Sequence, residues 1–113
     1  MTKKERQRQK KELLQEAENL GLAENFYFTT TFHRYCKLLE ILDALEVKIR
    51  EDGALVSKEY VKGRKNLYVN PAVTEYNKTT NIANNTVKSL ITIIEAFKEE
   101  KRADSKLDKF LSE

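Results

Sequence analysis

Residues 70–97 read NPAVTEYNKTTNIANNTVKSLITIIEAF, and this stretch carries the clearest helical signal in the chain. Asn70 is a good N-cap, and Pro71 suits the first helical position, where its missing N–H is not needed. Mostly apolar residues then recur at steps of three and four, which is the heptad pattern of helices that pack side by side. This seam consists of Val73, Tyr76, Thr80, Ala83, Val87, Leu90, Ile94 and Phe97. The stretch therefore predicts a long helix over residues 71–99.

A second helix is predicted before this one. Residues 21–29 look like a connector, after which Thr30 or Thr31 can cap a helix that runs to about Asp52. Its apolar positions are spaced mainly by three and four, and they form a stripe wide enough to pack against more than one neighbour. Gly53 is expected to end this helix.

Residues 54–69 lie between these two helices and have a different character. Residues 55–61 and 66–69 are rich in β-branched and aromatic residues, and Gly63 supplies a turn between them. This pattern predicts a β-hairpin. Its tip is basic because it holds Lys58, Lys62, Arg64 and Lys65.

Together these elements predict a mainly α protein, an antiparallel helical bundle of three helices with a small β-hairpin between helices two and three. We expect three segments along the chain: a basic N-terminal helix or arm with its connector over 1–29, a helix-hairpin-helix core and oligomerisation domain over 30–99, and a charged C-terminal tail over 100–113. The third helix also carries a second apolar row and several asparagines. Either the first helix or another subunit must cover the apolar surface of the third helix that the second helix does not cover.

The first helix is predicted over residues 3–20, with Gly21 as its stop, and it carries the excess of positive charge. The 113-residue chain has 21 Lys and Arg against 18 Asp and Glu, a formal net charge of only +3. The basic residues near its start are Lys3, Lys4, Arg6, Arg8, Lys10 and Lys11. We expect this arm and the hairpin tip to contact DNA phosphates, because such side chains neutralise backbone charge without reading bases. An inert, solvated charged face is the alternative.

Composition argues against several classes of protein. No apolar run approaches the ~20 residues that a membrane-spanning helix needs, and no secretory signal is expected. Three scattered glycines do not make a phosphate-binding loop, and His33 and Cys36 are too few to hold zinc. No nucleophile, base and oxyanion set is recognisable. We therefore expect a protein that is not an enzyme, binds no metal, cofactor or small-molecule substrate, and works in a reducing compartment.

The tail carries one small apolar cluster, made of Leu107, Phe110 and Leu111, which fall on one side of a short helix. Two interpretations stay open. The tail is either a frayed end with some docking to the core, or a linear motif that binds the groove of a partner.

Three parts of the sequence, taken together, resemble a known protein family. The run YCKLLEIL at residues 35–42, the hairpin from Leu55 to Val69, and the Asn-Pro-Ala start at residues 70–72 together look like the small terminase subunits of tailed bacteriophages. The resemblance covers residues 28 to 98, and its most specific element is the Asn-Pro-Ala start directly after the hairpin. The chain lacks room for the N-terminal helix-turn-helix domain of many members, so its DNA contacts would come from elsewhere.

The resemblance implies a non-catalytic partner in viral genome packaging. Such a protein binds double-stranded viral DNA and recruits it to the large terminase subunit, which holds the ATPase and nuclease. It also implies a homo-oligomeric ring, with the heptad seam joining the subunits, the C-terminal cluster as the partner contact, and action in the cytoplasm of the infected bacterial host.

Two other functions remain open from the sequence. One is a small transcriptional regulator of the winged-helix type, with the hairpin as the wing, although the second helix leaves few residues free to face a groove. The other is a helical adaptor that binds only protein. An adaptor is expected to bind no DNA at low salt, whereas the other two functions predict binding.

Overall fold

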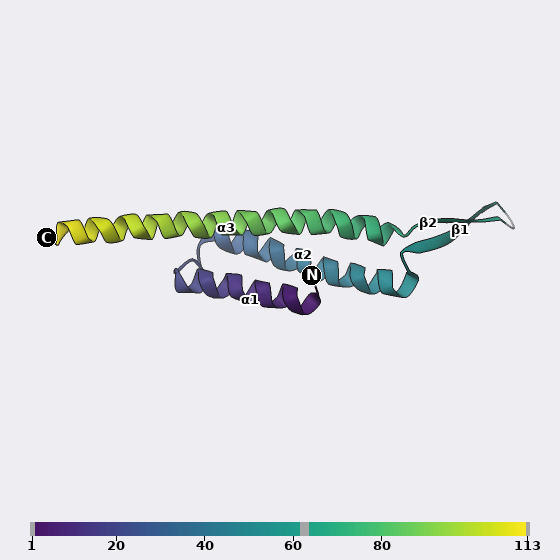
Figure 1. The fold of residues 1–113 in the computed structure, drawn as a ribbon, viewed down its shortest axis with the longest axis horizontal. Coiled ribbons are helices and arrows are strands. Elements are labelled where there is room, and N and C mark those ends of the chain that lie inside the picture. The colour runs from purple at the N-terminus through teal and green to yellow at the C-terminus, as the bar shows by residue number, and fades with distance from the viewer. Residues whose placement is uncertain (1, 62–63, 113) are drawn as a thin grey trace. The chain divides into compact units, whose positions relative to one another are not determined.

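The protein is mainly helical, as the sequence predicts, and its described residues form three helices. The computed structural model describes residues 2–61 and 64–112, with backbone alone for residues 56–61 and 64–66. In chain order the elements are α1 (Lys3–Asn19), α2 (Phe26–Asp52), β1 (Leu55–Val61), β2 (Arg64–Val69) and α3 (Pro71–Leu111) (Figure 1).

Helix α1 is closed at both ends by local hydrogen bonds. At its start, the Thr2 side chain accepts a hydrogen bond from the Glu5 N–H, and the Glu5 carboxylate accepts one from the Thr2 N–H, which is a capping box. At its end, Gly21 adopts a φ of 77°. The Leu22 N–H then reaches the Ala17 carbonyl at 2.8 Å, and both of these side chains are buried. The stop predicted at Gly21 is confirmed.

Helix α2 begins at Phe26, several residues before the predicted start at Thr30 or Thr31. The side-chain oxygen of Asn25 accepts a hydrogen bond from the Phe28 N–H at 3.1 Å and so caps the first turn. The aromatic and β-branched residues of this first turn have modest helix propensity, so the sequence pattern did not indicate that the helix begins there. The expected boundary between residues 29 and 30 therefore falls inside a helix.

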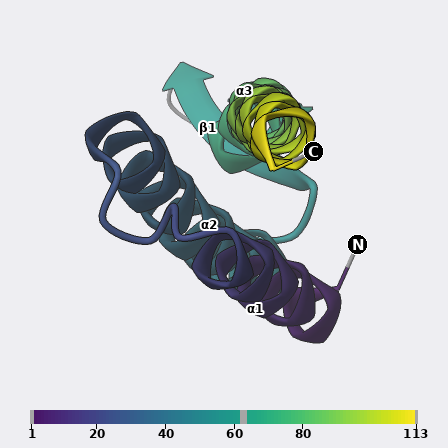
Figure 2. The same ribbon diagram turned by 90° about the vertical axis from the view of Figure 1, so that its left-hand side faces the viewer.

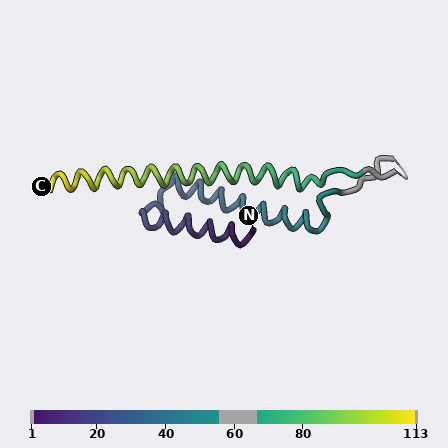
Figure 3. The backbone as a smooth tube through the Cα atoms, viewed as in Figure 1, coloured from purple at the N-terminus to yellow at the C-terminus, as the bar shows by residue number. Residues whose placement is uncertain are grey.

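Helix α3 runs without a break to Leu111, beyond the predicted end at residue 99 (Figure 3). The segment expected to be a tail is thus mostly a continuation of this helix. Its Lys, Arg, Glu and Ala residues are good helix formers, and Arg102 binds the Glu99 carboxylate one turn earlier at 3.0 Å.

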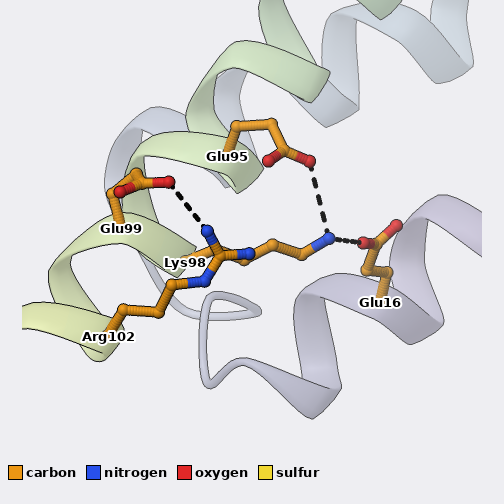
Figure 4. A network of polar contacts seen from close by, with 5 residues as sticks. All are labelled: Glu16, Glu95, Lys98, Glu99 and Arg102. Carbon is orange, nitrogen blue, oxygen red and sulfur yellow. Dashed lines mark hydrogen bonds and ion pairs between the residues drawn. The ribbon is translucent and has the colours of Figure 1, made fainter. Parts of the chain in front are cut away.

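The chain divides into two compact units. The first comprises residues 1–36 and 85–113. Within it, α1 and the first turns of α2 run antiparallel, joined by a short connector (Figures 1 and 2). Its buried apolar side chains are Leu13, Ala17, Leu22, Phe28, Tyr35, Leu90 and Ile94. Lys98 on α3 reaches the Glu16 carboxylate on α1 at 2.6 Å and also Glu95 at 3.5 Å (Figure 4).

The second unit comprises residues 37–84. Among its described side chains, the buried apolar ones are those of Leu39, Leu42, Ala72 and Ala83. The Tyr76 hydroxyl on α3 donates to the Glu46 carboxylate on α2 at 2.9 Å. Strands β1 and β2 pair antiparallel, with Leu55 opposite Val69.

Asn70 connects the parts of this second unit. Its side-chain oxygen accepts from the Ala72 N–H at 3.0 Å, which confirms the predicted cap of α3. Its side-chain amide donates to the Gly53 carbonyl at 2.8 Å, and its backbone N–H donates to the Ala54 carbonyl at 2.8 Å. One buried side chain therefore ties the end of α2 to the start of α3.

Candidate nucleic-acid interface

Helix α1 separates its charges by face. Lys4, Arg8 and Lys11 are exposed and follow one another at steps of four and three, so they lie along one side of the helix. We call these three residues the basic stripe. Leu13 and Ala17 lie on the opposite side, and both are buried. The stripe therefore points away from the core of its unit.

The basic stripe borders an open hollow on the protein surface. The hollow has a volume of about 540 Å³ and is lined by Thr2, Lys4, Glu5, Gln7, Arg8 and Lys11. The Arg8 guanidinium lies 4.0 Å from the Glu12 carboxylate, and both side chains are largely exposed. An exposed pair of this kind is weak, so Arg8 can exchange Glu12 for a phosphate at little cost. The arrangement suits contact with the backbone of a nucleic acid and not the reading of bases.

Arg6 does not belong to this surface, contrary to the expectation from sequence. Only 4% of Arg6 is exposed, because it lies on the same side of α1 as Leu13 and Ala17. A buried guanidinium cannot reach a phosphate in solvent. The sequence did contain a sign that Arg6 would be buried: Arg6 and Leu13 are seven residues apart, and residues at this spacing share a helix face. Of the other predicted basic residues in the arm, Lys3 is exposed and Lys10 is half-buried.

Arg6 instead faces the buried phenol of Tyr35, whose hydroxyl donates to the Gln9 side-chain oxygen at 2.9 Å. Burial raises the pKa of Tyr35 above its usual 10.0 and the neighbouring Cys36 raises it further, while the positive charge of Arg6 opposes the shift. This cluster holds α1 against α2, so it positions the helix that carries the basic stripe.

The raised pKa of Tyr35 predicts a loss of stability at alkaline pH. The unfolded phenol ionises first, so the stability that Tyr35 contributes is complete below pH 10.0 and is lost as the pH rises through the folded pKa. Tyr35→Phe is expected to lower the free energy of unfolding at pH 7 by about 1 kcal/mol, because one hydrogen bond is lost. The variant should then lose less stability than the wild type above pH 10. Urea unfolding across this pH range measures both effects. If the free energies of unfolding of the wild type and the variant fell equally above pH 10, Tyr35 would not be the group responsible.

The predicted contacts at the hairpin tip lie outside what the structure describes. Lys62 is outside the described residues, and the side chains of Lys58, Arg64 and Lys65 are outside the described atoms.

The heptad seam lies on the covered side of α3. Ala83, Leu90 and Ile94 are buried, and Val73, Tyr76, Thr80, Val87 and Phe97 are half-buried. Side chains packed in their own chain have little surface left for a second copy, so this seam serves mainly the core of the protomer. Thr79 and Thr86 are buried on the same side, which the sequence pattern missed because threonine is a polar residue.

The three predicted partner-binding residues are all exposed. Leu107 is 55% exposed, Phe110 is 73% exposed and Leu111 is 71% exposed. Docking of this cluster to the core, one of the two interpretations left open, is therefore not what the described residues show. Other exposed large apolar residues include the adjacent Phe26 and Tyr27, whose rings meet edge to face at 5.8 Å.

Among the described residues, no group of three or more His, Cys, Asp or Glu side chains could hold a metal ion. No helix within the described ranges is long and apolar enough to cross a membrane. Cys36 is the single cysteine of the sequence, so it forms no disulfide within the chain, and it is half-buried.

No protein-family model, no curated protein and no solved structure matches this chain.

Proposed function

We propose that this protein is a small terminase subunit that binds double-stranded viral DNA and recruits it to the large terminase subunit in the cytoplasm of an infected bacterium. It performs no catalysis in this role. The observation that carries the proposal is the basic stripe, three exposed cations on one side of α1 with the buried side chains of that helix on the other side. The resemblance of residues 28–98 to small terminase subunits supplies the packaging role.

The same proposal includes an assembly of several copies. We infer that the three helices pack as an antiparallel bundle with the hairpin between helices two and three, and that such protomers form a ring. One basic stripe neutralises few phosphates, but a ring presents many stripes to one duplex. The effective concentration of the remaining stripes then makes weak individual contacts add up.

Salt dependence of DNA binding tests the proposal. For the full chain, the logarithm of the binding constant is expected to fall linearly with the logarithm of salt concentration, because phosphate contacts release counterions. The triple variant Lys4→Gln, Arg8→Gln, Lys11→Gln should bind more weakly at low salt. If all three contacts are phosphate contacts, the salt slope per protomer should decrease by about 2.7. Titration of a labelled duplex at several salt concentrations measures both quantities.

A matched control removes the same charge elsewhere. Lys37, Lys48 and Lys78 are exposed, and each already pairs with a carboxylate, on Glu40, Asp52 and Glu75 respectively. Their triple replacement by Gln should leave DNA affinity near that of the wild type. If both triple variants lost the same DNA affinity, the loss would reflect the change in net charge and not the basic stripe. Absence of any DNA binding at low salt would instead favour the protein-binding adaptor.

A further inference from the structure

We propose that two copies of this chain pair through the last turns of α3, side by side and antiparallel, with Phe110 of each copy entering a hollow on the other. The inference concerns a surface separate from the basic stripe and does not depend on DNA binding. It rests on an exposed helix, a hollow beside that helix, and the order of charges along it.

The exposed helix is the part of α3 that follows Lys98. Every residue from Glu99 to Ser112 is exposed, yet Leu107, Phe110 and Leu111 form an apolar stripe on one side. We call these three residues the tail stripe. A helical segment of this length is marginal in water without a packing partner, and large exposed apolar side chains favour association. The described residues of the same unit leave the tail stripe uncovered.

The hollow lies on the same side of α3, about two to four turns nearer the start of the chain than Leu107. It has a volume of about 250 Å³, and its lining includes Leu22 and Tyr27 together with Ile93, Ala96 and Phe97 of α3. Steps of three and four lead from Ala96 through Glu100 and Ala103 to Leu107, so the hollow and the tail stripe share one helix face. A cavity of roughly 150 Å³ accommodates a benzene ring. The hollow is therefore large enough for a phenylalanine side chain.

The charges beside this face identify a second copy as the occupant. Glu99 and Lys106 lie along one edge of the face, and Lys101 and Asp104 lie along the other. In an antiparallel pair related by a two-fold axis, each edge meets the same edge of the other copy. The register that places Glu99 opposite Lys106 of the second copy also places Lys101 opposite Asp104 of the second copy. Each pairing occurs twice by symmetry.

The same register brings the apolar groups together. Its midpoint falls between Arg102 and Ala103, so Phe110 of one copy lies level with Glu95 and Ala96 of the other, beside the hollow. Residues 99–112 contain four acidic and four basic side chains, so pairing brings no net charge together. The basic ones are Lys101, Arg102, Lys106 and Lys109, and the acidic ones are Glu99, Glu100, Asp104 and Asp108. A partner protein that binds the tail stripe would have to displace the second copy.

Disulfide trapping tests the geometry in the full chain, with Cys36→Ser to remove the native thiol. Ala103→Cys lies next to the two-fold axis, so it should form a covalent dimer under mild oxidation. Leu111→Cys should not, because antiparallel pairing separates the two thiols by about 26 Å at ~1.5 Å per residue. Parallel pairing would cross-link both variants, and association through other surfaces would cross-link neither. Either result would overturn the proposal.

Sedimentation equilibrium tests the energetics without any new cysteine. The wild type should associate, and Phe110→Ala should weaken this association at least about tenfold, since buried aromatic anchors dominate interfaces. Asp104→Lys should weaken it about fivefold by facing Lys101 of the second copy, and adding Lys101→Glu should restore it. A monomeric wild type at high micromolar concentration, or no rescue by the double variant, would overturn the proposal. The basic-stripe triple variant should still pair, which separates this test from that of DNA binding.

Discussion

Phe28→Ala should lower the free energy of unfolding by about 3–5 kcal/mol, the largest effect that we expect from a single substitution. Only 1% of Phe28 is exposed, and its ring stacks on that of Phe32 with centroids 5.4 Å apart. Alanine would leave a cavity among the side chains that hold α2 in the first unit, and a close-packed interior refills such space only partly. Urea unfolding followed by circular dichroism measures the loss.

Phe26→Ala is the matched control. It makes the same chemical change two residues earlier in the same helix, at a position that is 74% exposed. Its expected cost is within about 0.5 kcal/mol, as for most surface substitutions. Similar losses in the two variants would mean that Phe28 does not lie in a packed core.

Asn70→Ala should lower the free energy of unfolding by about 2–3 kcal/mol. The substitution removes the cap of α3 and also the amide that satisfies the Gly53 carbonyl. Asn70 is only 4% exposed, so water cannot easily replace the lost partners. Asn70→Ser should fall between the wild type and the alanine variant, because a serine hydroxyl can cap the helix but is too short to reach Gly53.

Asn81→Ala is the control for this second prediction. Asn81 lies within the same helix and is exposed, and alanine has the higher helix propensity, so stability should stay the same or rise slightly. Urea midpoints of the four proteins at pH 7 give the comparison. If Asn70→Ala matched Asn81→Ala, the connection between α2 and α3 through Asn70 would be refuted.

Features encoded by neighbouring residues were predictable from the sequence. Gly21 ends α1 and Asn70 caps α3 as predicted, because each makes hydrogen bonds within a few residues of itself. The start of α2 was not predicted correctly, because its cap, Asn25, precedes aromatic and β-branched residues that are more typical of strands. The end of α3 was also missed, since a charged segment of good helix formers is equally typical of a solvated tail.

The candidate site was only partly predictable for a different reason. The sequence identifies six basic residues near the start, but composition does not say which side of the helix is covered. Arg6 and Arg8 lie two positions apart in the sequence, yet Arg6 is buried and Arg8 is exposed. The face of a helix that becomes buried depends on the neighbour that packs on it.

By itself, the sequence determined that this protein is mainly helical, where α1 stops and how α3 begins, because helix propensities and caps act over a few residues. Only the tertiary structure decided which cations of α1 remain available for phosphate, that much of the heptad seam serves the protomer's own core, and that Leu107, Phe110 and Leu111 stay exposed. Those outcomes depend on which surfaces meet after the chain folds, and contacts between residues far apart in the sequence leave no local signature.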